Sequence, residues 1–205
     1  MKKKLFFGVG IAAMMLASCG EAAEETTEGT DETTDEVVEE VVEPVTYEID
    51  TTASVINWFN TEGEEKGHWG TVKVLSGSYT TEGDMITSAS LSANMNTITS
   101  DDDMGGEKLA GHLMAPDFFD VNQFASADFT FSKHEEGTVY GTLSSAGLEF
   151  DIEAAATVTE GAVEIAEFKV DMSSLPFFVM EKEKEADESK HHDAMIGISA
   201  SIVGK

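Results

Sequence analysis

Apolar and polar residues alternate one by one along much of the chain after residue 47. The clearest runs are residues 88–96 and 148–158, in which every second side chain is apolar. Successive side chains of a β-strand point to opposite faces, so this period buries one face and leaves the other in water, as in antiparallel sheets. Turn residues, mostly around glycines, separate the runs. The pattern predicts eight main strands, near residues 54–60, 69–79, 84–98, 127–133, 138–144, 148–158, 162–172 and 194–203.

Two segments break this alternation. Leu109 and Leu113 stand four residues apart in residues 107–115, which predicts a short helix. Residues 181–193 are dense in charge and predict a loop or a helical turn between the last two strands. Eight antiparallel strands with one apolar face can close into a barrel, whose interior is either filled by side chains or holds one small ligand. The predicted fold class is therefore all-β, an eight-stranded antiparallel barrel with one short helix over residues 47–205.

The charge of the chain restricts its partners. Aspartate and glutamate number 40 against 12 lysines, and the sequence has no arginine. A nucleic-acid-binding protein needs clustered cations to displace the counterions of the phosphates. The composition therefore argues against nucleic acid as a partner.

The first residues have the pattern of an export signal. Three lysines precede the apolar residues 5–17, and the run ends in Leu16-Ala17-Ser18-Cys19. An apolar stretch this short does not span a bilayer, which takes about 20 residues, so it is interpreted as a signal peptide over residues 1–18. The segment closely resembles the lipobox of bacterial lipoproteins, and this resemblance implies that Cys19 becomes the acylated first residue. Two or three acyl chains, such as palmitate, would anchor the protein durably to a membrane.

Residues 19–46 predict a disordered acidic tether that follows the lipidated cysteine. Eleven carboxylates lie between Glu21 and Glu43, with no cation and no aromatic residue. Such a segment buries too little apolar surface to offset its ordering entropy. Cys19 is also the single cysteine, so no disulfide can form within the chain. The expected location is the bacterial cell envelope, at the periplasmic or surface face of the outer membrane.

The folded part resembles the YceI-like family. The most distinctive stretch combines Lys108-Leu109, Gly111-His112-Leu113, Asp117-Phe118-Phe119-Asp120-Val121, Phe124 and Phe129, and further matches are Tyr47, Ile49-Asp50, Ser54, Ile56, Trp58, Gly67-His68, Gly70, Gly141, Leu143 and Gly147-Leu148. The resemblance covers most of residues 47–158 in order. It implies an exported, lipocalin-like barrel that binds a polyisoprenoid or another long apolar molecule.

Small side chains on inward faces favour a ligand cavity. Ala89, Gly141 and Ala154 leave volume inside a barrel unless a large neighbour fills it, and aromatic and aliphatic residues would supply the apolar walls. Each of these aromatics could equally pack a solid barrel, and the Phe118-Phe119 pair could plug one end. The candidate ligand-binding residues are Trp58, Ala89, Leu91, Ala93, Met95, Phe129, Phe131, Leu143, Phe150, Ile152, Ala154 and Ala156.

Catalysis has no clear signature in the sequence. His191 and His192, with nearby carboxylates, are the closest approach to a metal site, but adjacent residues on a strand point to opposite faces and chelate poorly. No metal, no cofactor and no enzymatic activity are expected. The leading hypothesis is non-catalytic binding, with transport or storage, of a long apolar lipid in the cell envelope. The alternative is a structural or interaction lipoprotein whose barrel is filled.

Overall fold

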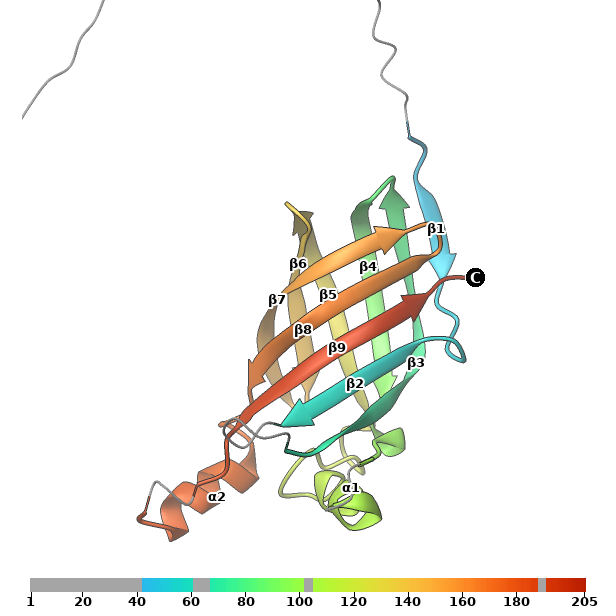
Figure 1. Ribbon diagram of the computed structural model, residues 1–205. Coiled ribbons are helices and arrows are strands. Elements are labelled where there is room, and N and C mark those ends of the chain that lie inside the picture. Colours follow the sequence, from blue (N-terminus) through green and yellow to red (C-terminus); the bar gives the residue numbers. More distant parts are fainter. Residues whose placement is uncertain (1–41, 61–66, 102–104, 188–190) are drawn as a thin grey trace, which may run out of the picture. The chain divides into compact units, whose positions relative to one another are not determined.

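The computed structural model describes residues 42–60, 67–101, 105–187 and 191–205. The predicted signal, Cys19 and nearly all of the predicted tether lie outside these residues. Within them, no helix is both long and apolar enough to cross a bilayer. The strands, shown in Figure 1, are β1 (Val45–Glu48), β2 (Val55–Asn60), β3 (Trp69–Glu82), β4 (Met85–Asn94), β5 (Ser126–Glu135), β6 (Thr138–Ser145), β7 (Leu148–Thr159), β8 (Ala162–Asp171) and β9 (Met195–Val203).

Eight of these strands form a closed antiparallel barrel. The order around the barrel is β3-β2-β9-β8-β7-β6-β5-β4, and β4 pairs with β3 to close it. Leu91 of β4 lies opposite both Gly77 of β3 and Phe129 of β5. The predicted fold class and its eight strands are confirmed. The ninth strand, β1, was not predicted; it pairs with the second half of β3.

The end of β4 differs from the sequence prediction. The strand stops at Asn94, and Met95–Thr97 form one turn of 3₁₀-helix instead of continuing to residue 98. The side chain of Asn94 accepts a hydrogen bond from the backbone N–H of Asn96 at 3.1 Å. This local bond competes with strand pairing, and it starts the connection that leads to the first helix.

Two helices lie at one end of the barrel (Figure 1). The predicted short helix is present as α1 (Gly106–Leu113). A second helix, α2 (Pro176–Lys184), begins before the segment 181–193 for which a loop or helical turn was predicted and includes its first four residues. Pro176 suits the first turn, where no intrahelical N–H partner is needed, and Lys182 and Lys184 in the last turn complement the helix dipole. The backbone N–H of Phe177 donates to the carbonyl of Asp117 at 2.7 Å, which ties α2 to the segment after α1.

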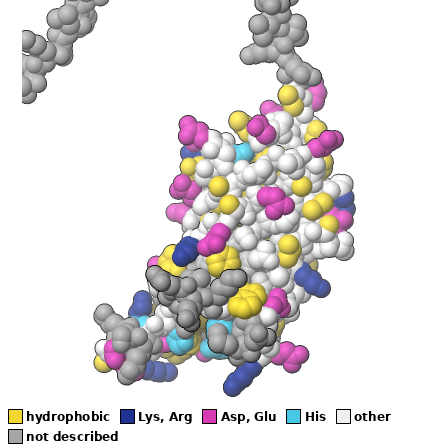
Figure 2. All heavy atoms as spheres, in the orientation of Figure 1, with side chains coloured by type: hydrophobic (Ala, Val, Ile, Leu, Met, Phe, Trp, Pro, Cys, Tyr) yellow, Lys and Arg dark blue, Asp and Glu magenta, His cyan; other side chains and the backbone are white. Residues whose placement is uncertain are grey.

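The core fills the two ends of the barrel unequally. A cluster that includes Phe118, Phe119 and Phe178 packs at the helical end and extends along the strands. A smaller cluster lies toward the opposite end and consists of Ile49, Val74, Tyr79, Ile86, Val139, Val163 and Ile202. On the outer surface, acidic side chains are spread along the strands (Figure 2). The alternation of the sequence is thus realised as an apolar interior and an acidic exterior.

Candidate functional site: an apolar cavity inside the barrel

A cavity of about 200 Å³ lies inside the barrel. On the same measure one water molecule needs ~10–15 Å³, so the space is an order of magnitude larger than a single hydration site. All eight barrel strands contribute to its wall, which is almost entirely hydrocarbon. The polar side chains in the wall are Ser78, Ser90, Ser145 and the phenol of Tyr79. Such a wall offers van der Waals contact along its length and few directional hydrogen bonds.

The structure brings most of the predicted site residues together. Nine of the twelve line the cavity: Trp58, Ala89, Leu91, Ala93, Met95, Phe129, Leu143, Ile152 and Ala154. The other three do not line it. Phe131 and Ala156 are half-buried beside the smaller core cluster, and Phe150 packs beside the larger one. Contact with a ligand stays a prediction for all twelve.

Sequence reasoning missed a large part of the wall. Ile196, Ile198 and Ile202 lie on the same face of β9 as Ala200, for which the sequence does predict an inward direction, and all four line the cavity. The same period-two signal that selected residues on β4 and β7 would have found them. The connecting segments carry no such period, so Leu113, Phe118 and Phe119 could be placed in the wall only by the fold.

Trp58 is held in the wall by a hydrogen bond. Its indole Nε1–H donates to the backbone carbonyl of Thr99 at 2.9 Å, and the residue is 7% exposed. Gly70 allows this approach, because a Cβ at that position would overlap the Thr99 carbonyl and lie 2.8 Å from Nε1. An apolar body with a satisfied polar edge is how a buried tryptophan is normally accommodated.

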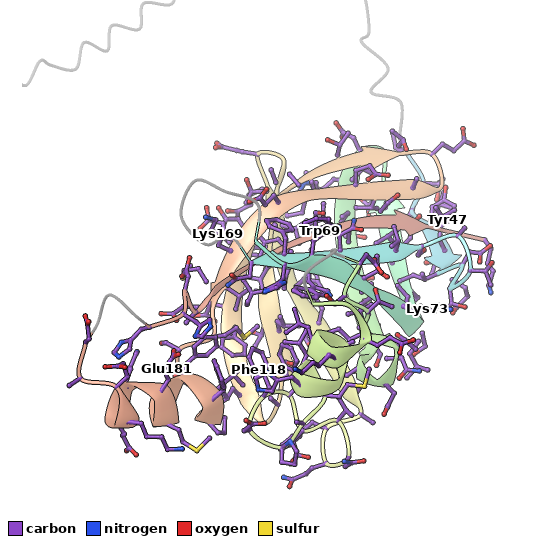
Figure 3. All side chains as sticks on the ribbon, turned by 60° about the horizontal axis from the view of Figure 1, so that its bottom comes forward. Tyr47, Trp69, Lys73, Phe118, Lys169 and Glu181 are labelled. Carbon is purple, nitrogen blue, oxygen red and sulfur yellow. The ribbon has the colours of Figure 1, made fainter. Side chains whose placement is uncertain are left out.

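Aromatic rings cluster at the helical end of the cavity. Phe118 packs edge to face against Phe119 with ring centroids 4.9 Å apart, and against Phe178 at 5.6 Å. Phe177 of α2 contacts Phe118 at 5.5 Å. Phe118 and Phe119 are buried and also line the cavity, so the predicted plug forms part of the cavity wall. Figure 3 views this end and labels Phe118 near α1 and Glu181 on α2.

A second, smaller chamber of about 120 Å³ adjoins this plug. It shares Trp58, Leu113, Phe118 and Ile196 with the main cavity. Its remaining wall is more polar and consists of Asn60, His68, Leu109, His112, Phe177, Phe178, His192 and Asp193. The two spaces therefore share part of their wall and differ in chemistry.

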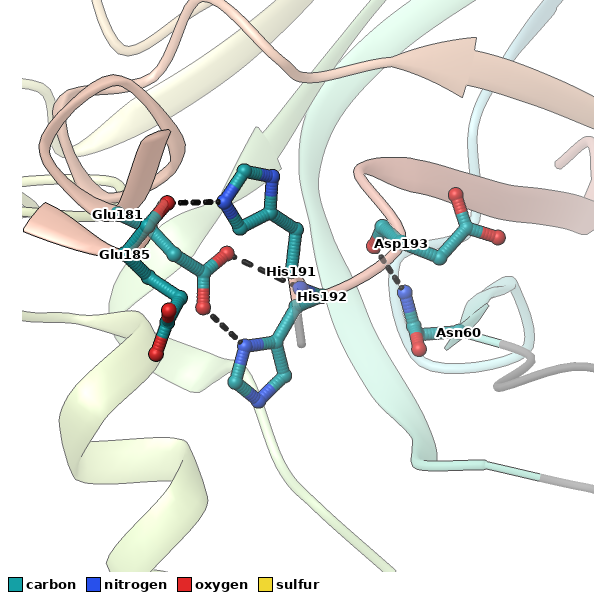
Figure 4. A network of polar contacts seen from close by, with 6 residues as sticks. All are labelled: Asn60, Glu181, Glu185, His191, His192 and Asp193. Atoms are coloured by element: carbon teal, nitrogen blue, oxygen red, sulfur yellow. Dashed lines mark hydrogen bonds and ion pairs between the residues drawn. The ribbon is translucent and has the colours of Figure 1, made fainter. Parts of the chain in front are cut away.

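A network of polar contacts holds the chain beside this chamber (Figure 4). Glu181 of α2 accepts from the ring Nδ1 of His192 at 2.5 Å and from its backbone N–H at 3.0 Å. Burial alone would raise the pKa of Glu181, but the hydrogen bonds from His192 outweigh burial and lower it. His191 contacts the carbonyl of Glu185 through Nε2 at 2.8 Å. Both rings are therefore engaged with α2.

Comparison with known proteins identifies the family. A model of the YceI-like domain matches residues 47–196. The chain belongs to the YceI-like family. YceI-like barrels bind apolar ligands such as polyisoprenoids, which agrees with the hydrocarbon wall of the cavity. No curated protein sequence matches the chain.

One of the solved structures that align with the chain shares the fold of this YceI-like domain. The crystal structure of BcnA from Burkholderia cenocepacia aligns with a TM-score of 0.52 and 14% identity, over 77% of this chain and 99% of BcnA. A mutant CJ YCEI protein aligns with a TM-score of 0.46 and 17% identity, over 64% of this chain and 82% of that one. At 14% identity the likeness to BcnA shows a common fold.

Two tyrosines stack toward the opposite end of the YceI-like barrel. Tyr47 of β1 pairs with Tyr79 of β3, and their rings stack with centroids 5.1 Å apart. Burial, and next the electrostatic effect of Tyr47, raise the pKa of Tyr79 above its ordinary value. The phenol therefore stays neutral at this end of the cavity across the physiological pH range.

In the part of the chain that the structure describes, no three His, Cys, Asp or Glu side chains are arranged to hold a metal ion. His191 and His192, the pair with some resemblance to a metal site in the sequence, contact Glu185 and Glu181 instead.

Proposed function

We propose that this YceI-like barrel binds one long apolar molecule of the isoprenoid type and carries or stores it in the cell envelope without changing it chemically. The observation that supports this most directly is the cavity of about 200 Å³ with a hydrocarbon wall. The family is one whose barrels bind apolar ligands. Burial of each ligand CH₂ is worth about 0.8 kcal/mol, so an extended chain gains affinity along its whole length.

An envelope location is part of this proposal. Cys19 in its lipobox supports acylation, and the acyl chains would hold the protein to a membrane. A membrane is also where isoprenoid lipids are found, and a protein that shields such a molecule from water allows it to leave the bilayer. The alternative function is that of a structural envelope lipoprotein with no ligand. The open volume of the cavity favours the carrier over this alternative.

The test is to purify the chain from residue 19 onward under native conditions, extract it with organic solvent and analyse the extract by mass spectrometry. A carrier is expected to release an apolar molecule in near-stoichiometric amount. Uptake of a fluorescent fatty-acyl probe by the delipidated protein gives a second, independent readout.

Ala93→Phe supplies the site-directed part of this test. Ala93 lines the cavity, so a phenyl group there should enter the open volume, lower the melting temperature only slightly and sharply reduce probe uptake. Ala155→Phe is the matched control, because Ala155 is exposed on the outer face of β7. Absence of any extracted molecule and of probe uptake, together with strong destabilisation by Ala93→Phe, would instead support the filled barrel.

A further inference from the structure

The second chamber differs from the main cavity in its hydrogen-bonding groups. The two spaces meet at Trp58 and Phe118. Beyond this boundary, polar side chains join apolar ones in the wall: Asn60, His68, His112, His192 and Asp193 stand beside Leu109, Phe177 and Phe178. A ligand that extends from the cavity into the chamber would thus pass from an almost entirely hydrocarbon surrounding into one that also holds polar groups, so its two ends should differ in the same way.

The charges around the chamber do not suit an anionic group. Among the residues that the structure describes, no lysine lines it, and the sequence has no arginine. Each of two histidines already faces a carboxylate, His192 with Glu181 at 2.5 Å and His112 with Asp117 at 3.5 Å. Asp193 adds a further negative charge to the wall. A phosphate or diphosphate would therefore lose its hydration without gaining the cations that normally bind it.

Two side chains that line the chamber carry hydrogen-bond acceptors. The amide NH₂ of Asn60 donates to the carbonyl of Asp193 at 2.8 Å, so its Oδ1 is left as the acceptor end of the side chain. The carboxylate of Glu181 accepts from Nδ1 of His192, which makes Nε2 the acceptor in the neutral ring. A hydroxyl or an amide N–H can donate to such groups, whereas an ionised acid cannot.

We propose that this chamber binds the uncharged head of an amphiphile, an alcohol or amide that donates a hydrogen bond, while the apolar tail occupies the main cavity. The inference rests on the proposed function, since it assumes that a tail binds there. It adds the chemical class of the head and the residues that recognise it, with His192 as the specificity-determining side chain.

The experiment holds the tail constant and varies the head. Four molecules compete with a fluorescent fatty-acyl probe for the delipidated chain at neutral pH. They share one C20 isoprenoid skeleton and differ in the head: phytane, phytol, phytanic acid and phytyl diphosphate. Phytol is expected to bind about three- to tenfold more tightly than phytane, the gain of one partly solvated hydrogen bond. Phytanic acid and the diphosphate are expected to bind more weakly than phytol, the diphosphate at least tenfold.

A pair of neighbouring substitutions assigns the effect to the chamber. His192→Phe keeps a ring against Phe177, whose centroid lies 5.7 Å away, but removes both nitrogens. It should bring the phytol-to-phytane affinity ratio close to one while phytane still binds. His191→Phe is the matched control, since His191 does not line the chamber, and it should leave the ratio unchanged. Comparing ratios cancels differences in solubility and in the stability of the variants.

Three results would overturn this inference and leave the proposed function intact. The wild type could bind phytol and phytane equally, or it could bind phytyl diphosphate more tightly than phytol. The phytol-to-phytane affinity ratio could also fall by the same amount in His191→Phe and His192→Phe. Failure of all four molecules to displace the probe, or of the probe to bind, would overturn the proposed function and this inference with it. The phytane measurement therefore separates the two failures.

Discussion

The ring of Phe129 lies over the backbone of Gly141, in the space that a side chain on residue 141 would fill. A Cβ there would overlap the ring edge of Phe129 and the carbonyl oxygen of Thr130. Phe129 lines the cavity, so the absence of a side chain on β6 determines where an aromatic side chain of β5 can lie. The shape of the wall thus depends on a residue that is not itself in it.

We expect Gly141→Ala to destabilise the protein. The added methyl group must displace Phe129 toward the cavity or move the backbone of β5, and overpacking of this kind typically costs about 1–3 kcal/mol. Urea unfolding at neutral pH measures the change in the free energy of unfolding.

Gly111→Ala is the control for this substitution. Gly111 lies on α1, and a methyl group added there would meet no neighbouring atom within 4 Å. Alanine is favoured over glycine in a helix by about 0.5–1 kcal/mol, so this variant should be slightly more stable than the wild type. Equal stability of Gly141→Ala and the wild type would show that Phe129 moves aside at no cost.

The same pair of residues shows what alternation in a sequence can and cannot predict. Period two placed Gly141 on an inward face, where a small residue leaves volume unless a large neighbour fills it. In the structure Phe129 fills that volume, whereas Ala93 and Ala154 do border open space. Alternation gives the face of a residue, but which neighbour occupies the space in front of it depends on the register between strands and on rotamers.

Elements that form through distant contacts were the ones not predicted. Residues 45–48 follow an acidic run and become β1 only because they pair with residues 78–81 of β3. The second chamber joins Asn60 at the end of β2, His112 on α1 and His192 on the connection before β9, which are far apart in the sequence. The barrel could therefore be predicted from local pattern and family resemblance, while the polar chamber required the fold.

We expect Trp58→Phe to be destabilising through one lost hydrogen bond. Phenylalanine retains most of the apolar contact but leaves the Thr99 carbonyl without the indole N–H that lies 2.9 Å away. A buried acceptor left unsatisfied costs about 1–3 kcal/mol. Trp69→Phe makes the same chemical change on an exposed residue, 42% accessible on β3, and should alter the free energy of unfolding by less than about 0.5 kcal/mol. Equal losses in the two variants would contradict a specific role of the Trp58 bond.

Acylation of the chain can be tested at Cys19. Because Cys19 is the single cysteine of the sequence, we expect Cys19→Ser to abolish metabolic labelling with an acyl analogue and to leave the protein uncleaved or released from the membrane. Labelling that persists in the mutant would contradict the lipoprotein hypothesis. Cys19 lies outside the residues that the structure describes, so this prediction rests on the sequence alone.

Glu181 should make the stability of the protein depend on pH in the acidic range. Its side chain is 15% exposed, and its carboxylate joins α2 to the segment before β9 through two contacts with His192. Burial alone would raise its pKa, but the bonds from His192 hold the pKa below the ordinary value of 4.5. A carboxyl group whose pKa is lower in the folded state stabilises the fold fully above the unfolded pKa, and this contribution is lost as the pH falls through the folded pKa.

Glu181→Gln removes this charge at nearly constant volume. We expect the variant to be less stable than the wild type at pH 7 and the difference to shrink as the pH falls below about 4.5, the ordinary value for this group. Glu183→Gln, an exposed neighbour on α2, removes the same charge and should show no such convergence, because exposed charges contribute little. Comparing the two variants cancels the general gain that a strongly acidic protein obtains when its carboxylates are neutralised. The difference in the free energy of unfolding between Glu181→Gln and the wild type could instead stay constant from pH 7 to pH 3. That result would mean that the contact acts through packing, because the advantage of an ionised carboxylate is lost when it is protonated.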